Sequence, residues 1–180
     1  ANHTEISVSD NDLQFEVVGN QIHFSFAGIH NKTFTDREVL FQMPFLYEQG
    51  ATVLGDGFQM LAQTSGTISQ PIDIGRCPDN NNSYRIYPES APKRYYNYLA
   101  VEDAAGYTLF GFTSCHRFAG YFEVQTHGEH WVLFASIDGE HTQVADWEHN
   151  TLESVAILRG QSLSELYQQY SEMLAEHHPA

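Results

Sequence analysis

The stretch LQFEVVGNQIHFSF, residues 13–26, decides the fold class of this chain. Apolar and polar side chains alternate over residues 13–17 and again over residues 22–26, which is the pattern of strands with one buried face. The Val-Gly-Asn-Gln stretch at 18–21 supplies the residues of a tight turn. The segment therefore predicts an antiparallel β-hairpin.

The same two-residue period returns along the rest of the chain. It is found over residues 85–87, 96–101, 108–112, 121–126, 131–137 and 152–158. Turn-forming glycines lie between these segments. Short strands at intervals of about ten residues indicate an antiparallel sandwich rather than a parallel sheet with crossover helices. The sequence predicts a mainly β fold, an antiparallel β-sandwich of supersandwich-like form.

One segment near the C-terminus has a helical period instead. Residues 162–165, Ser-Leu-Ser-Glu, form a capping box, and apolar side chains then recur at helical spacing until the His-His-Pro sequence at 177–179. This pattern predicts one terminal α-helix. Its apolar stripe either packs on the sandwich or docks on a part of the chain that follows. We expect the sandwich to span residues 1–160 and the helix to lie within 161–180.

Glycine, proline and asparagine cluster in the middle of the chain, over residues 49–57, 77–82 and 87–92. These residues favour turns, so loops are expected to concentrate between positions 50 and 95. Loops carry binding and catalytic residues more often than strands do. The middle of the chain is therefore the first place to look for a functional site.

The composition limits the classes of partner. The 180 residues are 42% apolar, enough for a sizeable core, and 23 acidic residues against 8 Lys and Arg give a formal net charge of -15. A surface of this charge repels nucleic-acid phosphates and anionic bilayers. No stretch reaches the ~20 apolar residues that span a bilayer, and the first residues lack the features of a signal peptide. We expect no nucleic-acid and no membrane partner.

The cysteines and histidines give weak signals for chemistry. Cys77 and Cys115 form no CxxC pair and no disulfide framework, which favours a cytoplasmic setting and leaves a single bond between them open. His127 and His130 flank a glycine turn without the helix of an HExxH motif, so solvated turn histidines are expected rather than a metal site. Cys115 and His116 would point to opposite faces of a strand, which disfavours a nucleophile beside its base. We predict no metal and no cofactor.

A pair of acidic residues gives an alternative hypothesis of a catalytic site. Asp146 and Glu148 flank Trp147 in an extended segment, so both carboxylates lie on one face. A glycosidase needs two carboxyl groups roughly 5 to 9 Å apart. With 23 acids in the chain, chance proximity is the expected explanation of such a pair.

Sugar recognition is the better motif-level hypothesis. In residues 54–61, Gly55 and Gly57 flank Asp56, and Phe58 and Gln59 follow at once. An aromatic ring stacks on the apolar face of a pyranose, while carboxylate and amide groups bind its hydroxyls. Asp56, Phe58 and Gln59 are thus the candidate substrate-binding residues. The alternative is a glycine-bounded loop that enters a core strand.

Three segments together resemble a known family. They are residues 57–61 (GFQML), 109–114 (LFGFTS) and 153–160 (ESVAILRG), the last leading into the expected helix. In order and spacing they are similar to the N-terminal β-sandwich domain of the α-galactosidases of glycoside hydrolase family 36, along most of the chain. In that family a Gly-aromatic-Gln segment is followed by Ser-Trp, and a strand and helix lead into a catalytic (β/α)8 barrel. Here Met60 and Leu61 stand where the family often has Ser-Trp.

The resemblance implies a function without catalysis in this chain. The family's paired Asp nucleophile and acid reside in the barrel, for which 180 residues leave no room. The chain would be the accessory part of an α-galactosidase-like enzyme that packs on the barrel and lends Asp56 to Gln59 to the rim of the sugar pocket. Two alternatives remain: a free-standing, lectin-like carbohydrate-binding module, and a small enzyme that uses Asp146 and Glu148. Oligomerisation is compatible with each of them.

Overall fold

The fold is described from a computed structural model. The described residues are 13–26, 29–35, 37–45, 47, 51–56, 63–67, 71–74, 94–115, 118–127, 130–140, 143–147 and 151–178. Their strands are β1 (Leu13–Val18), β2 (Gln21–Phe26), β3 (Ile29–Thr33), β4 (Glu38–Pro44), β5 (Thr52–Asp56), β6 (Gln63–Thr67), β7 (Pro71–Ile74), β8 (Arg94–Asp103), β9 (Gly106–Phe112), β10 (Ala119–His127), β11 (His130–Asp138), β12 (Gln143–Trp147) and β13 (Thr151–Gly160). The helix is α1 (Leu163–His177).

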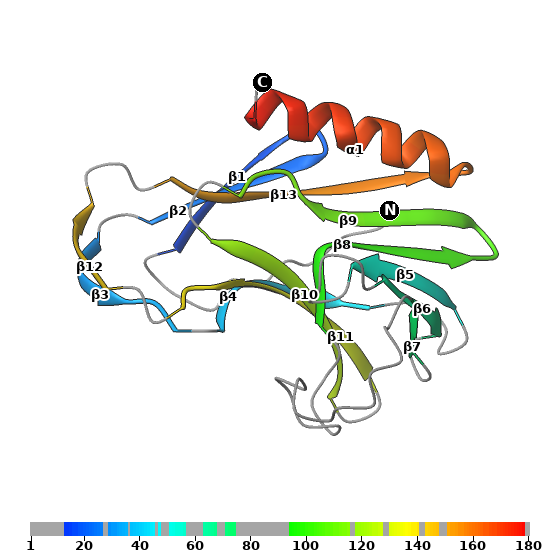
Figure 1. The fold of residues 1–180 in the computed structure, drawn as a ribbon, viewed down its shortest axis with the longest axis horizontal. Coiled ribbons are helices and arrows are strands. Elements are labelled where there is room, and N and C mark those ends of the chain that lie inside the picture. The colour runs from blue at the N-terminus through cyan, green and yellow to red at the C-terminus, as the bar shows by residue number, and fades with distance from the viewer. Residues whose placement is uncertain are drawn as a thin grey trace.

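Most of these strands belong to one antiparallel sheet. Its order is β1-β2-β13-β9-β8-β10-β11-β4, and β5 pairs with β8 and continues through β6 to β7. A separate small sheet joins β12 to β3. In Figure 1 the large sheet is folded over into two layers, with β2, β13 and β9 above β4, β10 and β11. The prediction of a mainly antiparallel β fold with a C-terminal helix is confirmed.

Strand β8 is the corner that connects the two layers. Its residues Arg94 to Tyr96 pair with β10, and its residues Tyr98 to Asp103 pair with β9. Asn97 between them has a φ of 67°, a left-handed conformation that asparagine tolerates better than most residues. The strand therefore turns at Asn97 and serves one layer on each side of the turn.

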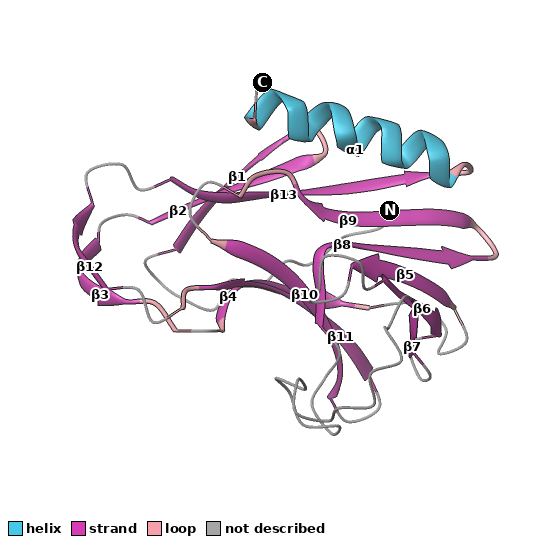
Figure 2. Cartoon of the chain, in the orientation of Figure 1, coloured by secondary structure: helices cyan, strands magenta, loops and turns pink. Residues whose placement is uncertain are grey.

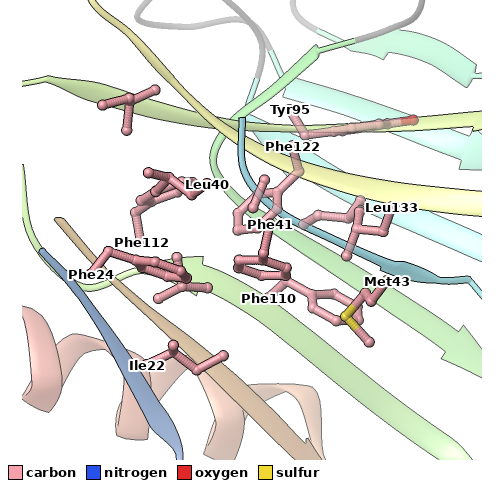
Figure 3. Close-up of a cluster of buried hydrophobic side chains, with 14 of the residues drawn as sticks. Ile22, Phe24, Leu40, Phe41, Met43, Tyr95, Phe110, Phe112, Phe122 and Leu133 are labelled. Atoms are coloured by element: carbon pink, nitrogen blue, oxygen red, sulfur yellow. The ribbon is translucent and has the colours of Figure 1, made fainter. Parts of the chain in front are cut away.

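An aromatic core fills the space between the layers (Figure 3). Phe24 on β2 and Phe41 on β4 are both buried, and their rings stack with centroids 5.6 Å apart. These two strands lie near opposite ends of the sheet order, so the sheet curls until its ends face each other. Each fully buried side chain of this size contributes roughly 1.5–3 kcal/mol through the hydrophobic effect.

Helix α1 packs on the outer face of the layer that contains β13 and β9, as Figure 2 shows. Ser162 caps its first turn and accepts a hydrogen bond from the backbone N–H of Glu165, as the capping box predicts. Leu166 and Tyr170 are buried, and the Tyr170 hydroxyl donates to the carbonyl of Phe112 over 2.6 Å. Of the two alternatives for the apolar stripe, packing on the sandwich is the one observed.

The strand predictions hold where the pattern is strongly periodic. The expected hairpin is β1 and β2, and the segments 96–101, 108–112, 121–126, 131–137 and 152–158 lie inside β8, β9, β10, β11 and β13. Residues 85–87 lie outside the described part of the chain. The expectation that loops dominate positions 50–95 is wrong in part, because β5, β6 and β7 lie there. These short strands form by pairing with β8 and with one another, and strand propensity depends strongly on such context.

Among the described residues, no helix combines the length and the apolar character needed to cross a lipid bilayer.

Candidate functional site

The predicted sugar-binding segment begins at the end of β5. Asp56 is the last residue of that strand, and its partner on β8 is Tyr96, after a shift of register between Gly55 and Asp56. The side chain of Asp56, and Phe58 and Gln59 altogether, lie outside the described part of the structure. The structure thus places where the segment starts and leaves its proposed sugar contacts as predictions.

Gly55 allows β5 to approach β8 closely. A Cβ at this position would lie 2.7 Å from the Tyr95 ring and 2.9 Å from the carbonyl oxygen of Tyr98. Any side chain here would push the two strands apart. The glycine that precedes Asp56 thus allows close packing on Tyr95.

A row of residues crosses the sheet from the end of β5. Tyr96 pairs with Tyr121 on β10, and Tyr121 pairs with Ser136 on β11. Residues directly opposite in antiparallel strands share a face of the sheet. The rings of Tyr96 and Tyr121 are tilted against each other with centroids 5.6 Å apart, and Tyr121 and Ser136 are completely buried.

A buried carboxylate lies beside this row and holds two of the eight cationic side chains of the protein. Glu123 on β10 is 3% exposed. It accepts bonds from Arg94 Nε at 3.0 Å and Gln125 Nε2 at 2.8 Å, and Arg37 Nη2 lies 3.3 Å from it. We call these four residues the Glu123 cluster. A buried charge is tolerated when it is paired and hydrogen-bonded in this way.

The arginines of the cluster also pack on aromatic rings. The guanidinium carbon of Arg94 lies 4.3 Å from the centre of the Tyr121 ring, and that of Arg37 lies 5.4 Å from the centre of the Phe134 ring. Such contacts add cation–π attraction to the ion pairs. The cluster therefore joins β8, β10 and β11 to the residue that precedes β4.

The electrostatics favour a positioning role for these groups over acid–base chemistry. Burial raises the pKa of the Tyr121 phenol, the charge of Glu123 raises it further, and Arg94 and Arg37 oppose the shift. Tyr121 is thus a neutral side chain at ordinary pH. The Glu123 carboxylate already accepts from Arg94 and Gln125 and is paired with Arg37, which leaves little capacity to activate a water.

A second polar network ties β13 to the connection between β9 and β10. The fully buried Glu153 accepts from the Ser114 hydroxyl and from the backbone N–H of Phe118 at 3.2 Å. Ser114 Oγ in turn accepts from the backbone N–H of Ser154 at 3.0 Å. His23 Nδ1 lies 2.7 Å from Ser154 Oγ. These bonds satisfy a buried carboxylate and fix the chain at this point.

The structure corrects the setting assumed for Cys115. This residue follows the end of β9 and is not part of a strand, and its backbone N–H donates to His178 Nε2 at 3.2 Å. Its thiol is free and exposed. Burial of part of the thiol and the negative charge of Glu153 raise the pKa of Cys115, which disfavours the reactive thiolate. Cys77 and His116 lie outside the described residues.

The remaining sequence candidates are not members of the cluster. His127 and His130 are paired in the register of β10 and β11, and in the described part of the chain no group of three or more potential ligands could hold a metal ion. Asp146 lies in β12 opposite His30 on β3. Its side chain and all of Glu148 lie outside the described residues, so the acid pair stays a hypothesis.

Sequence reasoning missed the Glu123 cluster and the Ser114–Glu153 network. The alternation over residues 121–126 places Tyr121, Glu123 and Gln125 on one face of β10, which is a signal that the sequence does contain. The partners cannot be read from it, because Arg94 and Glu123 are brought together by strand pairing.

Comparison with known proteins finds no family model that matches the chain and no curated protein that matches it significantly.

Proposed function

We propose that this chain is a non-catalytic β-sandwich domain of an α-galactosidase-like glycoside hydrolase. Its partner would be a catalytic (β/α)8 barrel, and its role would be to hold residues 56–59 at the rim of the barrel's sugar site. The resemblance of the segments at 57–61, 109–114 and 153–160 motivates the family. The observation that supports the role is the position of Asp56, whose strand ends opposite Tyr96 and beside the Glu123 cluster.

The Glu123 cluster would help to hold residues 56–59 in place. Sugar-binding groups act best when they are held in position before the ligand arrives. Misplacement of a positioning group by about 1 Å can cost on the order of a hundredfold in rate. Arg94 lies two residues before Tyr96 on β8 and is bonded to Glu123, which lies two residues after Tyr121 on β10. The strand that receives Asp56 is thus fixed by a buried ion pair, and the segment after Asp56 starts from a rigid base.

The chemistry of the segment suits a hydroxylated, uncharged ligand. Phe58 offers an aromatic face, and Asp56 and Gln59 offer groups that accept and donate bonds to hydroxyls. A neutral sugar also avoids the repulsion that an anionic ligand would meet from a chain with a net charge of -15. The proposal includes a cytoplasmic setting, in which a free thiol such as that of Cys115 persists.

The test is sugar binding, measured by titration calorimetry with galactose and raffinose. We expect the 180-residue chain alone to bind neither sugar tightly, and the same chain extended by its downstream-encoded residues to bind. In the extended protein, Phe58→Ala or Gln59→Ala should weaken binding about tenfold or more, while Phe15→Ala on the distant strand β1 should not.

Tight binding by the 180-residue chain alone, lost on Phe58→Ala, would instead establish the free-standing carbohydrate-binding module. Binding by the extended protein that is unchanged by Phe58→Ala and Gln59→Ala would remove the role assigned to residues 56–59.

A further inference from the structure

Strand β1 is an open edge of the large sheet, and it is apolar. It lies at one end of the strand order, and among the described strands it pairs with β2 alone. Phe15, Val17 and Val18 are 46%, 59% and 54% exposed, and in the described part of the chain the exposed large hydrophobic residues are these three. An exposed apolar edge strand is a template for pairing with another strand.

Strand β4, at the opposite end of the strand order, has features that hinder pairing with another strand. Strand β4 ends in Pro44, which has no N–H to donate, and a bulge interrupts its pairing with β11 at Ala135 and Ser136. Prolines and bulges are the usual means by which proteins prevent edge-to-edge pairing. β1 contains neither proline nor lysine, and Glu16 is its single charged residue. Of these two edge strands, β4 is protected and β1 is not.

The hairpin geometry decides which main-chain groups β1 offers. In a two-residue hairpin the residues that flank the turn form a hydrogen-bonded pair. The turn is Gly19 and Asn20, so Val18 bonds to Gln21, and alternate residues back along β1 also direct their N–H and C=O groups to β2. Leu13, Phe15 and Val17 therefore direct theirs to the open edge.

We propose that two copies of this chain pair through their β1 strands, antiparallel, with a two-fold axis at Phe15. In this register Phe15 lies opposite Phe15 of the partner subunit, and Leu13 lies opposite the partner's Val17. On the other face, Gln14 lies opposite the partner's Glu16, so an amide meets a carboxylate. Apolar side chains thus meet on one face, and a hydrogen-bond donor meets an acceptor on the other.

The alternative registers are worse on the same grounds. An axis at Glu16 would place two glutamates directly opposite each other, and like charges in such a pair destabilise it. An axis at Leu13 or Val17 would shorten the overlap. The chosen register also continues the core face of the sheet, because Phe15 already contacts Phe24 with ring centroids 6.5 Å apart. A second copy is therefore the occupant that this edge fits.

The experiment is sedimentation equilibrium of the 180-residue chain, which measures the dimer dissociation constant directly. Wild type should form a dimer and no larger species. Gln14→Glu should weaken the dimer about tenfold, because the two symmetric contacts each become a glutamate opposite a glutamate. The double variant Q14E/E16Q should restore it, because a glutamate then faces a glutamine again.

The control variant is Gln42→Glu, the same substitution on the exposed face of β4, with the same change of net charge. It should leave the dissociation constant unchanged. Circular dichroism and urea unfolding of each variant establish that it is folded. A wild-type chain that stays monomeric at high concentration would overturn the proposal, as would a dimer that Q14E weakens no more than Q42E or that Q14E/E16Q fails to restore.

Discussion

At the scale of single residues, the protein depends on carboxylates that are buried and fully partnered. Glu123 brings two arginines and a glutamine to one point, and Glu153 accepts from Ser114 and from the backbone of Phe118. Removing one partner of a buried charge is costly because the other is left uncompensated. The two carboxylates therefore fix the strands from which they extend.

Glu123→Gln should lower the free energy of unfolding by about 3 kcal/mol, because it leaves Arg94 buried beside a neutral amide. Urea unfolding followed by fluorescence measures the change. Glu102→Gln, at an exposed position further along β8, is the control and should cost less than about 0.5 kcal/mol. Equal effects of the two substitutions would show that the buried ion pair adds no more to the free energy of unfolding than an exposed glutamate does.

The buried phenol of Tyr121 should make the folded protein less stable at alkaline pH. Burial raises its pKa above the ordinary value of 10.0, so the folded chain holds the phenol proton more tightly than the unfolded chain does. The contribution of this group to stability is complete below pH 10 and falls as the pH rises further, by up to about 1.4 kcal/mol per pH unit. Tyr121→Phe should flatten the fall in urea-measured stability between about pH 10 and 11.5. An unchanged pH slope would contradict the assignment.

The contacts of single residues were the part of the structure that the sequence predicted least. The alternation at 121–126 places Glu123 on one face of a strand. Its ion-pair partners, Arg94 and Arg37, lie far from it in the sequence. Ser114 and Glu153 are 39 positions apart, and no local pattern relates them. Partners that meet only through tertiary structure leave no periodic signal in the sequence.

Among the helices and strands, the sequence patterns predicted those elements that local interactions determine. The β1–β2 hairpin follows from alternation around a Gly-Asn turn, and α1 follows from a capping box and a helical stripe. Strands β5, β6 and β7 escaped prediction because they are short and gain strand structure from pairing with β8 and with one another. In the candidate site, the sequence singled out the segment at Asp56, whose sugar contacts stay a prediction, and it did not single out the neighbouring residues on β8 and β10.

The docking of α1 on the sheet should depend on Gly111. A Cβ at this position would lie 2.5 Å from the ring of Tyr170, so Gly111→Ala should displace the helix and cost about 2 kcal/mol. Gly160→Ala lies under the same helix, but its Cβ would meet the flexible end of Leu166 at 3.3 Å and should cost less. Thermal unfolding of both variants measures the difference. The reverse order of stabilities would contradict the observed packing of α1.

At the scale of the whole molecule, net charge works against association while the open edge at β1 favours it. Two copies with a charge of -15 each repel one another, and salt screens this repulsion over a Debye length of about 10 Å at 0.1 M. The proposed dimer should therefore tighten as NaCl rises from about 20 to 300 mM. Sedimentation at several salt concentrations checks this, and a dimer that weakens with salt would indicate an interface held by ion pairs instead.

The proposal that this chain supports chemistry performed by a neighbouring barrel is tested most directly by its own hydrolytic activity. The measurement is turnover of an aryl α-galactoside by the purified 180-residue chain, beside the same chain extended by its downstream-encoded residues. We predict turnover by the extended protein and none by the 180-residue chain. Turnover by the 180-residue chain, abolished by Asp146→Asn or Glu148→Gln, would contradict the proposal and identify the chain itself as the enzyme.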